Sequence, residues 1–250
     1  MQLYGLENTK EFELGFYALI PAAGSGSRMR GDHAVERAAQ SKQYLPLAGK
    51  PMLWHAVASV CVAPVQNVFV VLAPEDREFA RHDWSAFAGK LEPLYCGGET
   101  RRDSVYNGLV AAMAAVDADD WMLVHDAARP CLPKRDLESL IAETREDSIG
   151  GILALPTAET VKKAAKDEIG TLRIAGTEDR SQLWLAQTPQ MFRCGLLAQA
   201  LKAAKGVVTD EAGAVEQMGL KPRLVAGSRE NIKVTFPEDL KIAEAILAKR

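Results

Sequence analysis

Apolar residues in this chain gather in short runs, each followed by residues that end a strand. The runs span 16–20, 68–72, 121–125 and 151–155. Pro21, Pro74 and Pro156 close three of them, and the turn-prone sequence AARP follows the fourth. Runs that are apolar at nearly every position are typical of strands buried on both faces. We therefore predict a largely parallel central sheet.

Between these runs, apolar positions recur at the spacing of a helix. One helical face, at i, i+4, i+8 and i+11, carries Val105, Leu109, Met113 and Val116. A second stripe begins after Asp136, and a third runs from 196 to 204 before Gly206. The last predicted helix opens at Thr235–Glu238 (TFPE), the pattern of a capping box with proline in the first turn. Strands that alternate with helices predict an α/β fold of three layers.

Two segments depart from this alternation. Residues 156 to about 189 are polar and show little helical periodicity, which leaves open a projecting β-hairpin arm or a surface loop. Residues 1–15 carry three glutamates and lack the apolar stretch of a signal peptide, so we expect a loosely held leader. We expect residues 16–250 to form one domain, with the 156–189 segment as its appendage.

Composition narrows the class of protein. The 250 residues are 48% hydrophobic and 25% charged, which is typical of a globular chain. Thirty basic and 33 acidic residues give a net charge of −3, so we expect neither nucleic acid nor an anionic membrane as a partner. The apolar runs are also too short to cross a bilayer. The four cysteines lie far apart with no metal-binding spacing, which favours a reducing cytoplasm.

The most informative chemistry follows the first predicted strand. In PAAGSGSRM (21–29), small residues let backbone amides approach a polyphosphate, and Arg28 adds a fixed positive charge. Lys42 follows in a turn closed by proline. A tight strand-to-helix connection would explain the glycines equally well. The segment is not a Walker A sequence, and Met29 stands where a dinucleotide fingerprint needs glycine, which argues against a nicotinamide oxidoreductase.

Several further motifs follow in order along the chain. They are KQYLPLAGKP, GGETRRDSV, VHDAARP, TVK, LWLAQTPQ, TDE and NIKVT. Together with PAAGSGSRM they resemble the nucleotidyltransferases that activate sugar and polyol phosphates. The sequence is most similar to the 2-C-methyl-D-erythritol 4-phosphate (MEP) cytidylyltransferase family of the non-mevalonate isoprenoid pathway, over roughly residues 16–248. The segment RGDHAVERAAQS, between Met29 and Lys42, is longer than this family usually carries.

The resemblance implies a three-layer, Rossmann-like (GT-A-like) nucleotidyltransferase fold with a mostly parallel sheet and a protruding β-arm. It implies transfer of CMP from CTP to MEP, with pyrophosphate as the second product. Mg²⁺ is the expected cofactor, bridging phosphate oxygens. The nucleophilic phosphate is already ionised near neutral pH, so positioning and electrostatics suffice without a general base. The family forms homodimers in which the arm, here 156–189, reaches the neighbouring site.

The resemblance also assigns roles to individual residues. Arg28 and Lys42 are expected to contact the triphosphate and stabilise the transition state. Arg180 and Lys233 are expected to orient the MEP phosphate. The remaining positions expected to bind the substrates are Ala22, Ala23, Gly24, Gly98, Glu99, Ser104, Asp126, Arg129 and Thr160.

Other assignments from the resemblance carry alternatives. Asp126 is expected near the ribose and the metal, with Asn231 as a weaker candidate on the metal side. Arg129 could instead form a structural ion pair with Asp103. His125, next to Asp126, is expected to pack rather than to transfer protons. If the arm reaches a neighbouring subunit, Thr160 and Arg180 act in trans.

Two rival functions remain open at this point. One is a cytidylyltransferase for another polyol phosphate, such as ribitol 5-phosphate, because the motifs specify nucleotide transfer better than they specify the polyol. The other is an inactive module that only senses nucleotides. The joint presence of Arg28, Lys42, Asp126 and Lys233 argues against the inactive module.

Overall fold

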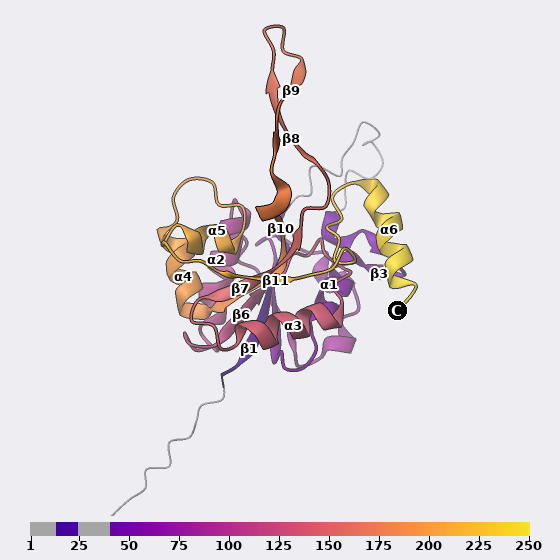
Figure 1. Cartoon of the computed structure of the whole chain (residues 1–250). Coiled ribbons are helices and arrows are strands. Elements are labelled where there is room, and N and C mark those ends of the chain that lie inside the picture. Colours follow the sequence, from indigo (N-terminus) through magenta and orange to yellow (C-terminus); the bar gives the residue numbers. More distant parts are fainter. Residues whose placement is uncertain (1–13, 25–40) are drawn as a thin grey trace, which may run out of the picture.

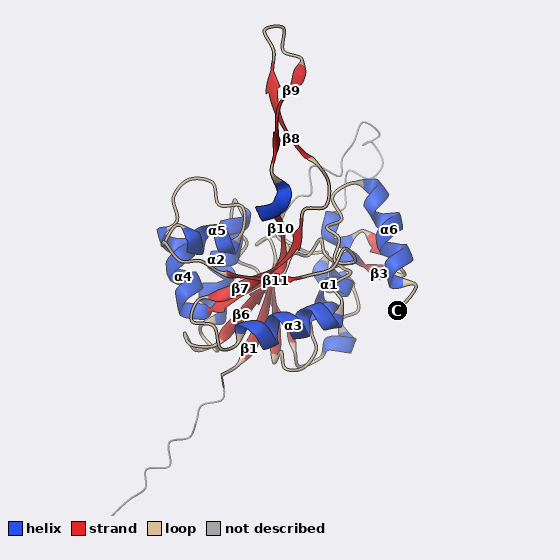
Figure 2. Cartoon of the chain, in the orientation of Figure 1, coloured by secondary structure: helices blue, strands red, loops and turns tan. Residues whose placement is uncertain are grey.

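One seven-stranded sheet forms the centre of the protein, whose computed structural model describes residues 14–24 and 41–250 (Figures 1 and 2). In chain order the strands are β1 (Phe16–Pro21), β4 (Asn67–Val71), β5 (Leu91–Leu94), β6 (Trp121–Val124), β7 (Gly150–Pro156), β10 (Trp184–Arg193) and β11 (Arg223–Ala226). Their order across the sheet is β11-β7-β10-β6-β1-β4-β5. Only β10 runs antiparallel to its neighbours, β6 and β7. All four predicted runs are strands, and the mostly parallel sheet is confirmed.

Helices cover both faces of this sheet. They are α1 (Met52–Val60), α2 (Arg101–Ala112), α3 (Lys134–Thr144), α4 (Cys194–Ala203), α5 (Glu211–Glu216) and α6 (Pro237–Leu247). Ala18 and Ile20 of β1 join the core cluster beneath α1 and α3, whereas Leu19 joins the cluster beneath α2, α4 and α5. Alternate residues of one buried strand therefore feed two apolar layers, as the three-layer prediction requires. No helix in the described part of the chain has the length and apolar character needed to cross a bilayer.

A smaller apolar cluster joins α6 to the start of α1 and the hairpin before it. Ala243 of α6 is buried with Leu47 and Met52, from the segment that contains the short hairpin β2 (Pro46–Leu47) and β3 (Lys50–Pro51). Val234, just before α6, belongs to the same cluster. This packing fixes the segment 228–236 against the body of the protein.

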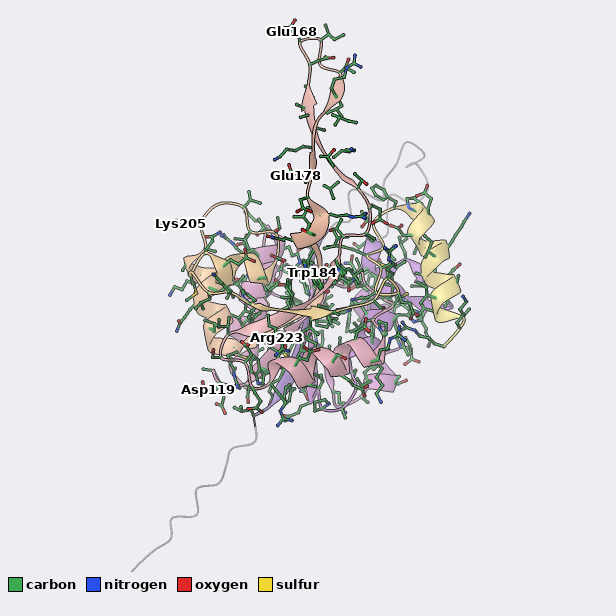
Figure 3. The ribbon with its side chains drawn as sticks, in the orientation of Figure 1. Asp119, Glu168, Glu178, Trp184, Lys205 and Arg223 are labelled. Carbon is green, nitrogen blue, oxygen red and sulfur yellow. The ribbon has the colours of Figure 1, made fainter. Side chains whose placement is uncertain are left out.

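The segment after β7 forms a hairpin arm. Its strands β8 (Val161–Lys166) and β9 (Leu172–Glu178) pair antiparallel and project away from the helices, with Glu168 near the tip (Figure 3). The arm alternative is therefore the right one, rather than a surface loop. The predicted limit of 189 is too far along the chain, because β10 begins at Trp184 and continues from the arm base into the central sheet.

The start of α6 corrects one detail of the sequence prediction. The helix begins at Pro237, so its third residue is Asp239 rather than Glu238. The Asp239 carboxylate accepts hydrogen bonds from the backbone N–H groups of Thr235 (2.7 Å) and Phe236 (2.8 Å). The Thr235 hydroxyl donates instead to the Lys233 carbonyl, at 3.2 Å. Proline in the first helical position thus shifts the capping carboxylate by one residue.

Candidate active site

A cavity of about 440 Å³ opens at the carboxyl ends of β1 and β6. These adjacent strands lie where the sheet changes its direction of growth, with β4 and β5 on one side and β10 on the other. In open α/β sheets, ligands bind at such switch points. The lining residues are Pro21–Gly24, Lys42, Gln43, Met52, Gly98–Arg101, Ser104, Asp126–Ala128 and Lys233.

The loop after β1 is fastened so that its backbone faces this cavity. Ala22 donates its N–H to the Val71 carbonyl (2.8 Å), and its own carbonyl accepts from Gln43 Nε2 at 2.7 Å. Gly97 packs behind the loop, where an added Cβ would lie 2.3 Å from the Ala23 Cβ. This position therefore requires glycine. The predicted residues Ala22, Ala23 and Gly24 all line the cavity.

The loop that leads into α2 forms a second wall. The Gly98 N–H donates to the Ser104 hydroxyl at 3.1 Å, and that hydroxyl donates to the Thr100 carbonyl at 3.0 Å. Thr100 and Asp103 form the capping box that starts α2. The structure therefore brings Gly98, Glu99 and Ser104 to the cavity, as predicted. The buried Ser104 hydroxyl also fixes the turn that presents the Gly98 backbone.

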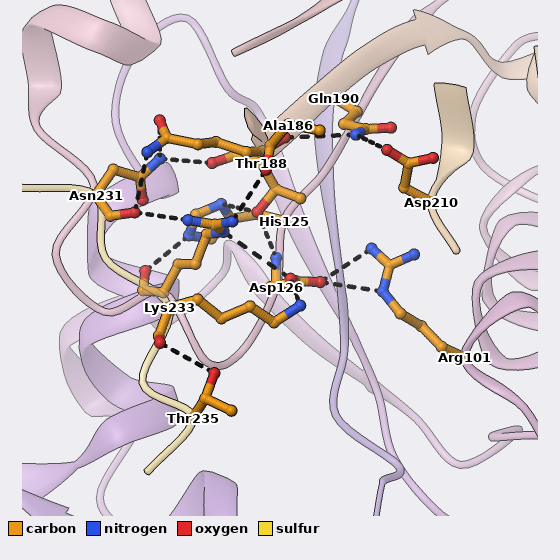
Figure 4. A network of polar contacts seen from close by, with 12 residues as sticks. Arg101, His125, Asp126, Ala186, Thr188, Gln190, Asp210, Asn231, Lys233 and Thr235 are labelled. Carbon is orange, nitrogen blue, oxygen red and sulfur yellow. Dashed lines mark hydrogen bonds and ion pairs between the residues drawn. The ribbon is translucent and has the colours of Figure 1, made fainter. Parts of the chain in front are cut away.

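The charged side chains in and beside the cavity gather around Asp126. Its Oδ2 lies 2.7 Å from Lys233 Nζ, and its Oδ1 lies 3.0 Å from Arg101 Nη2 (Figure 4). Arg129 Nε is 4.0 Å from Oδ2. Burial alone would raise the pKa of Asp126, but the charges of Arg101 and Lys233 outweigh it and hold the pKa well below its usual range. The carboxylate therefore stays ionised.

Arg101 links this carboxylate to a second one. Its Nη1 lies 2.6 Å from Glu211 Oε1 and its Nη2 lies 3.1 Å from Glu211 Oε2, which makes a bidentate pair. Burial would lower the pKa of Arg101, but the charges of Glu211 and Asp126 raise it above its ordinary value. Neither Arg101 nor Glu211 was assigned a role from the sequence. Arg101 stands in the motif GGETRRDSV and Glu211 in the motif TDE, and this placement was the signal that could have marked them as site residues.

Arg129 lies beneath the cavity rather than in its wall. Its Nη1 donates to the Asn231 carbonyl at 2.6 Å and its Nη2 to the Ala186 carbonyl at 3.3 Å. The alternative pairing with Asp103 is wrong, because Asp103 bonds Thr100 and Arg102 at the start of α2. Arg129 therefore joins β10 to the segment that carries Lys233.

Asn231 belongs to the same buried network. Its Nδ2 donates to the Thr188 carbonyl at 2.8 Å, and the residue is fully buried. The structure does not place Asn231 among the residues that line the cavity. Lys233 follows two positions later, so this contact fixes the backbone from which Lys233 reaches Asp126.

His125 packs as the sequence predicted. The ring is fully buried, with Nε2 3.0 Å from the Arg129 carbonyl and Nδ1 3.1 Å from the Thr188 hydroxyl. The same hydroxyl accepts the Asp126 N–H at 3.0 Å. Burial lowers the pKa of His125 to about 4, so the ring is neutral at neutral pH. The contacts of His125 position the Asp126 backbone.

The described residues contain no cluster of three or more histidine, cysteine, aspartate or glutamate side chains able to hold a metal. Asp126 is nevertheless a carboxylate that lines the cavity and stays ionised. Mg²⁺ usually takes one or two protein carboxylates and completes its shell with water and substrate phosphates. Asp126 could therefore serve as the single protein carboxylate for a Mg²⁺ ion that arrives with a nucleotide.

Three predicted residues lie away from this cavity or outside the described residues. Arg28 falls in the range 25–40, which the structure does not describe. Most of the predicted leader, residues 1–13, also lies outside the described residues. Thr160 and Arg180 are exposed on and beside the arm, and neither lines the cavity. The Arg180 guanidinium donates to the Ala158 carbonyl at the arm base. A single chain therefore does not bring these two residues to the other predicted positions.

Comparisons with known proteins agree over nearly the whole chain. Residues 16–249 match the family described as IspD, 2-C-methyl-D-erythritol 4-phosphate cytidylyltransferase. A protein of that name from Nitrosospira multiformis is 55% identical over 236 residues, covering 93% of this chain and 97% of the relative. A solved structure of 4-diphosphocytidyl-2C-methyl-D-erythritol synthase is 35% identical with a TM-score of 0.78, covering 94% of this chain and all of the other. The Francisella tularensis enzyme gives a TM-score of 0.73 at 35% identity, covering 93% of this chain and 99% of the other.

Proposed function

Because this chain belongs to the 2-C-methyl-D-erythritol 4-phosphate cytidylyltransferase family, we propose that its cavity is the place where CTP and MEP react. The enzyme transfers CMP from CTP to MEP, forming 4-diphosphocytidyl-2-C-methyl-D-erythritol and pyrophosphate for isoprenoid precursor synthesis. One observation supports this cavity as the place of the reaction. The loop Ala22–Gly24, Lys42 and Lys233 come from distant parts of the sequence and face one cavity.

Positive charge suits the chemistry of this reaction. A phosphate oxygen of MEP attacks the α-phosphorus of CTP, and the bond from that phosphorus to the leaving pyrophosphate breaks. Negative charge builds on the α-phosphoryl group and on the pyrophosphate. Lys42, with Arg28, stabilises this charge, since cationic groups positioned in advance act where charge develops. No proton has to be removed from the ionised phosphate, so the neutral, buried His125 is left to position backbone.

Different walls of the cavity bind different parts of the two substrates. The loop Ala22–Gly24 receives the triphosphate through the backbone amides of Ala23 and Gly24, and the Gly98–Glu99 turn with Ser104 receives the cytidine. Asp126 lies between the walls, near the ribose. Lys233 orients the MEP phosphate so that one of its oxygens faces the α-phosphorus. Holding two mutually repelling anions in line supplies much of the rate enhancement in such a reaction.

Mg²⁺ is the proposed cofactor. When bound, it would neutralise phosphate charge and help to align the triphosphate. Asp126 would hold it together with the substrate oxygens, and the buried Asn231 would support it only indirectly. The ionised state of the Asp126 carboxylate and its place in the cavity lining support this assignment.

The arm supports a homodimer. It exposes large apolar side chains, among them Ile169 in its turn and Leu172 and Ile174 on β9. We assign this surface to a second copy, so that Thr160 and Arg180 complete the partner's site in trans. The match over residues 16–249 supports one cytidylyltransferase domain over 16–250. The four cysteines are all free, which supports the reducing cytoplasm as its location.

Pyrophosphate release tests this proposal. The protein is incubated with CTP, Mg²⁺ and one polyol phosphate at a time, with MEP and ribitol 5-phosphate as the two principal arms. We expect rapid release with MEP and much slower release with ribitol 5-phosphate. Preferred use of ribitol 5-phosphate would overturn the assigned substrate. No release with any polyol phosphate would overturn the catalytic assignment of the cavity.

A further inference from the structure

Glu211 is a buried carboxylate that none of the roles above uses. It opens α5, its side chain is only 1% exposed, and both of its oxygens receive hydrogen bonds from Arg101. A bidentate arginine–carboxylate pair has a strongly defined geometry. Removing one member would leave the other charge buried without its partner.

Arg101 is fully engaged between two carboxylates. Nη1 and Nη2 bond Glu211, while Nε and Nη2 each lie 3.0 Å from Asp126 Oδ1. The guanidinium nevertheless lines the cavity and is 30% exposed. An arginine at the edge of a phosphate site would otherwise turn toward the incoming polyanion. Its position beside Asp126 therefore depends on a competing negative charge on its other side.

We propose that Glu211 is a positioning residue for nucleotide transfer. It holds Arg101 against Asp126, so that the carboxylate keeps one orientation when the triphosphate enters the cavity. Glu211 touches neither substrate and acts only through Arg101. This inference rests on the proposed function of the cavity.

The attachment of α5 does not depend on this ion pair. The Asp210 carboxylate caps the helix by accepting the Gly213 N–H at 3.0 Å. Gln190 of β10 accepts the Ala212 N–H at 2.8 Å and donates to Asp210 at 2.9 Å. Glu216→Gln removes an exposed charge from the same helix without touching Arg101, which makes it a matched control.

The experiment compares kcat/KM for CTP at saturating MEP in the full-length wild type and its variants. Glu211→Gln keeps the size of the side chain and removes its charge. We expect about a tenfold loss, the size of one weakened hydrogen bond to a charged group. In an Arg101→Met background the same change should cause no further loss, since coupled residues are not additive. Glu216→Gln should change kcat/KM by less than about twofold, the range expected of an exposed substitution away from the ion pair.

Two results would overturn the inference: wild-type kcat/KM in Glu211→Gln, or an undiminished further loss in the Arg101→Met background. If Glu211→Gln does not fold, the Arg101→Met/Glu211→Gln double variant, which removes both charges, is compared with Arg101→Met alone. Equal kcat/KM values support the inference, and a lower value in the double variant contradicts it. The wild-type protein, assayed alongside, reports separately on the proposed function.

Discussion

The ammonium group of Lys233 lies 2.7 Å from Oδ2 of Asp126, and this contact joins the segment before α6 to the end of β6. Lys233 is still 41% exposed, so it can meet a ligand without leaving Asp126. The pair therefore connects the two proposed substrate positions. Its lysine is the natural first target for mutation.

Lys233→Met should raise KM for MEP by about tenfold or more, the scale of one charge-assisted hydrogen bond. The loss should be larger in kcat/KM for MEP than in kcat/KM for CTP. Steady-state kinetics with each substrate varied in turn measure both. Lys241→Met, an exposed lysine on α6, is the matched control and should behave as wild type. An unchanged KM for MEP would remove Lys233 from the MEP site.

Lys42→Ala should lower kcat by about 10² or more, because it removes a positioned charge from the transition state. Arg28→Ala should have an effect of the same size. Pre-steady-state and steady-state pyrophosphate release provide the measurement, and thermal unfolding checks that the fold is kept. Lys202→Ala, on α4 and away from the cavity, is the control. Near-normal kcat in the Lys42 variant would refute its assignment.

Mixed dimers can decide whether the arm acts in trans. Arg180→Ala alone should mainly weaken the use of MEP. When equal amounts of Lys42→Ala and Arg180→Ala chains are unfolded and refolded together, half of the dimers are mixed, and each mixed dimer has one intact site. Activity should then recover to roughly a quarter of the wild-type value, as expected for a symmetric dimer.

Two controls accompany this mixing experiment. Arg173→Ala changes an exposed arginine on β9 that pairs with Asp167, and it should leave activity intact. At a MEP concentration below the wild-type KM, each variant refolded alone should show little activity. Failure of the mixture to recover activity, or a fully active monomer in sedimentation, would place Arg180 outside the neighbouring site.

Gly97→Ala should disturb the phosphate loop. Its new Cβ would meet the Ala23 Cβ at 2.3 Å and the Leu72 carbonyl oxygen at 2.8 Å, so the loop or β4 must move. Overpacking of this kind costs about 1–3 kcal/mol of unfolding free energy, and the KM for CTP should rise as well. Gly176→Ala, in the arm, has nothing within 4 Å of the added atom and is the control. Equal stability of both variants would contradict the tight fit.

Two buried thiols give the protein a distinct response to alkaline pH. Burial raises the pKa of Cys131 to about 11 and of Cys194 to about 12. Above the ordinary thiol pKa of about 8.5, the unfolded chain loses protons that the folded chain keeps. The unfolding free energy should therefore fall as pH rises, by about 1.4 kcal/mol per pH unit for each thiol, until the folded pKa is reached.

Urea unfolding at several pH values from 8 to 10.5 measures this slope. The matched variant is Cys131→Ala/Cys194→Ala, which removes both thiols and should show a shallower decline. Groups that titrate in both proteins cancel in the comparison. Parallel slopes in the two proteins would show that these thiols ionise as readily in the folded chain as in the unfolded one.

The central strands were predictable because strands that are buried on both faces appear in the sequence as unbroken apolar runs. The edge strand β5 was not, since its LEPL sequence contains Pro93 and only partly buried side chains. The antiparallel strand β10 was also missed, because its first half continues the polar arm and its second half enters the core. The residues of the arm showed only an interruption of helical periodicity, and the family resemblance supplied the expectation of a β-arm.

The candidate site was predictable where a residue acts through its own place in a motif. Ala22–Gly24, Lys42, Gly98 and Asp126 all line the cavity. The pairing of Arg101 with Glu211 was not, because 110 positions separate the two residues and only the packing of both α2 and α5 on α4 brings them together. Sequence could place Arg129 near the site, but not show that its side chain points into the buried network below.

Insertions at the base of the arm and insertions at its tip should have different effects, because β10 continues from the base into the central sheet. From Ala186 to Gln190 the strand advances four residues while β7 advances two, an even surplus that leaves the alternation of faces intact. One residue inserted between Trp184 and Thr188 would turn the Thr188 hydroxyl to the opposite face, away from the Asp126 N–H. Residues added at the tip, between Asp167 and Thr171, would leave that bond untouched. Natural variation in the length of the arm should therefore accumulate at its tip and leave its base unchanged.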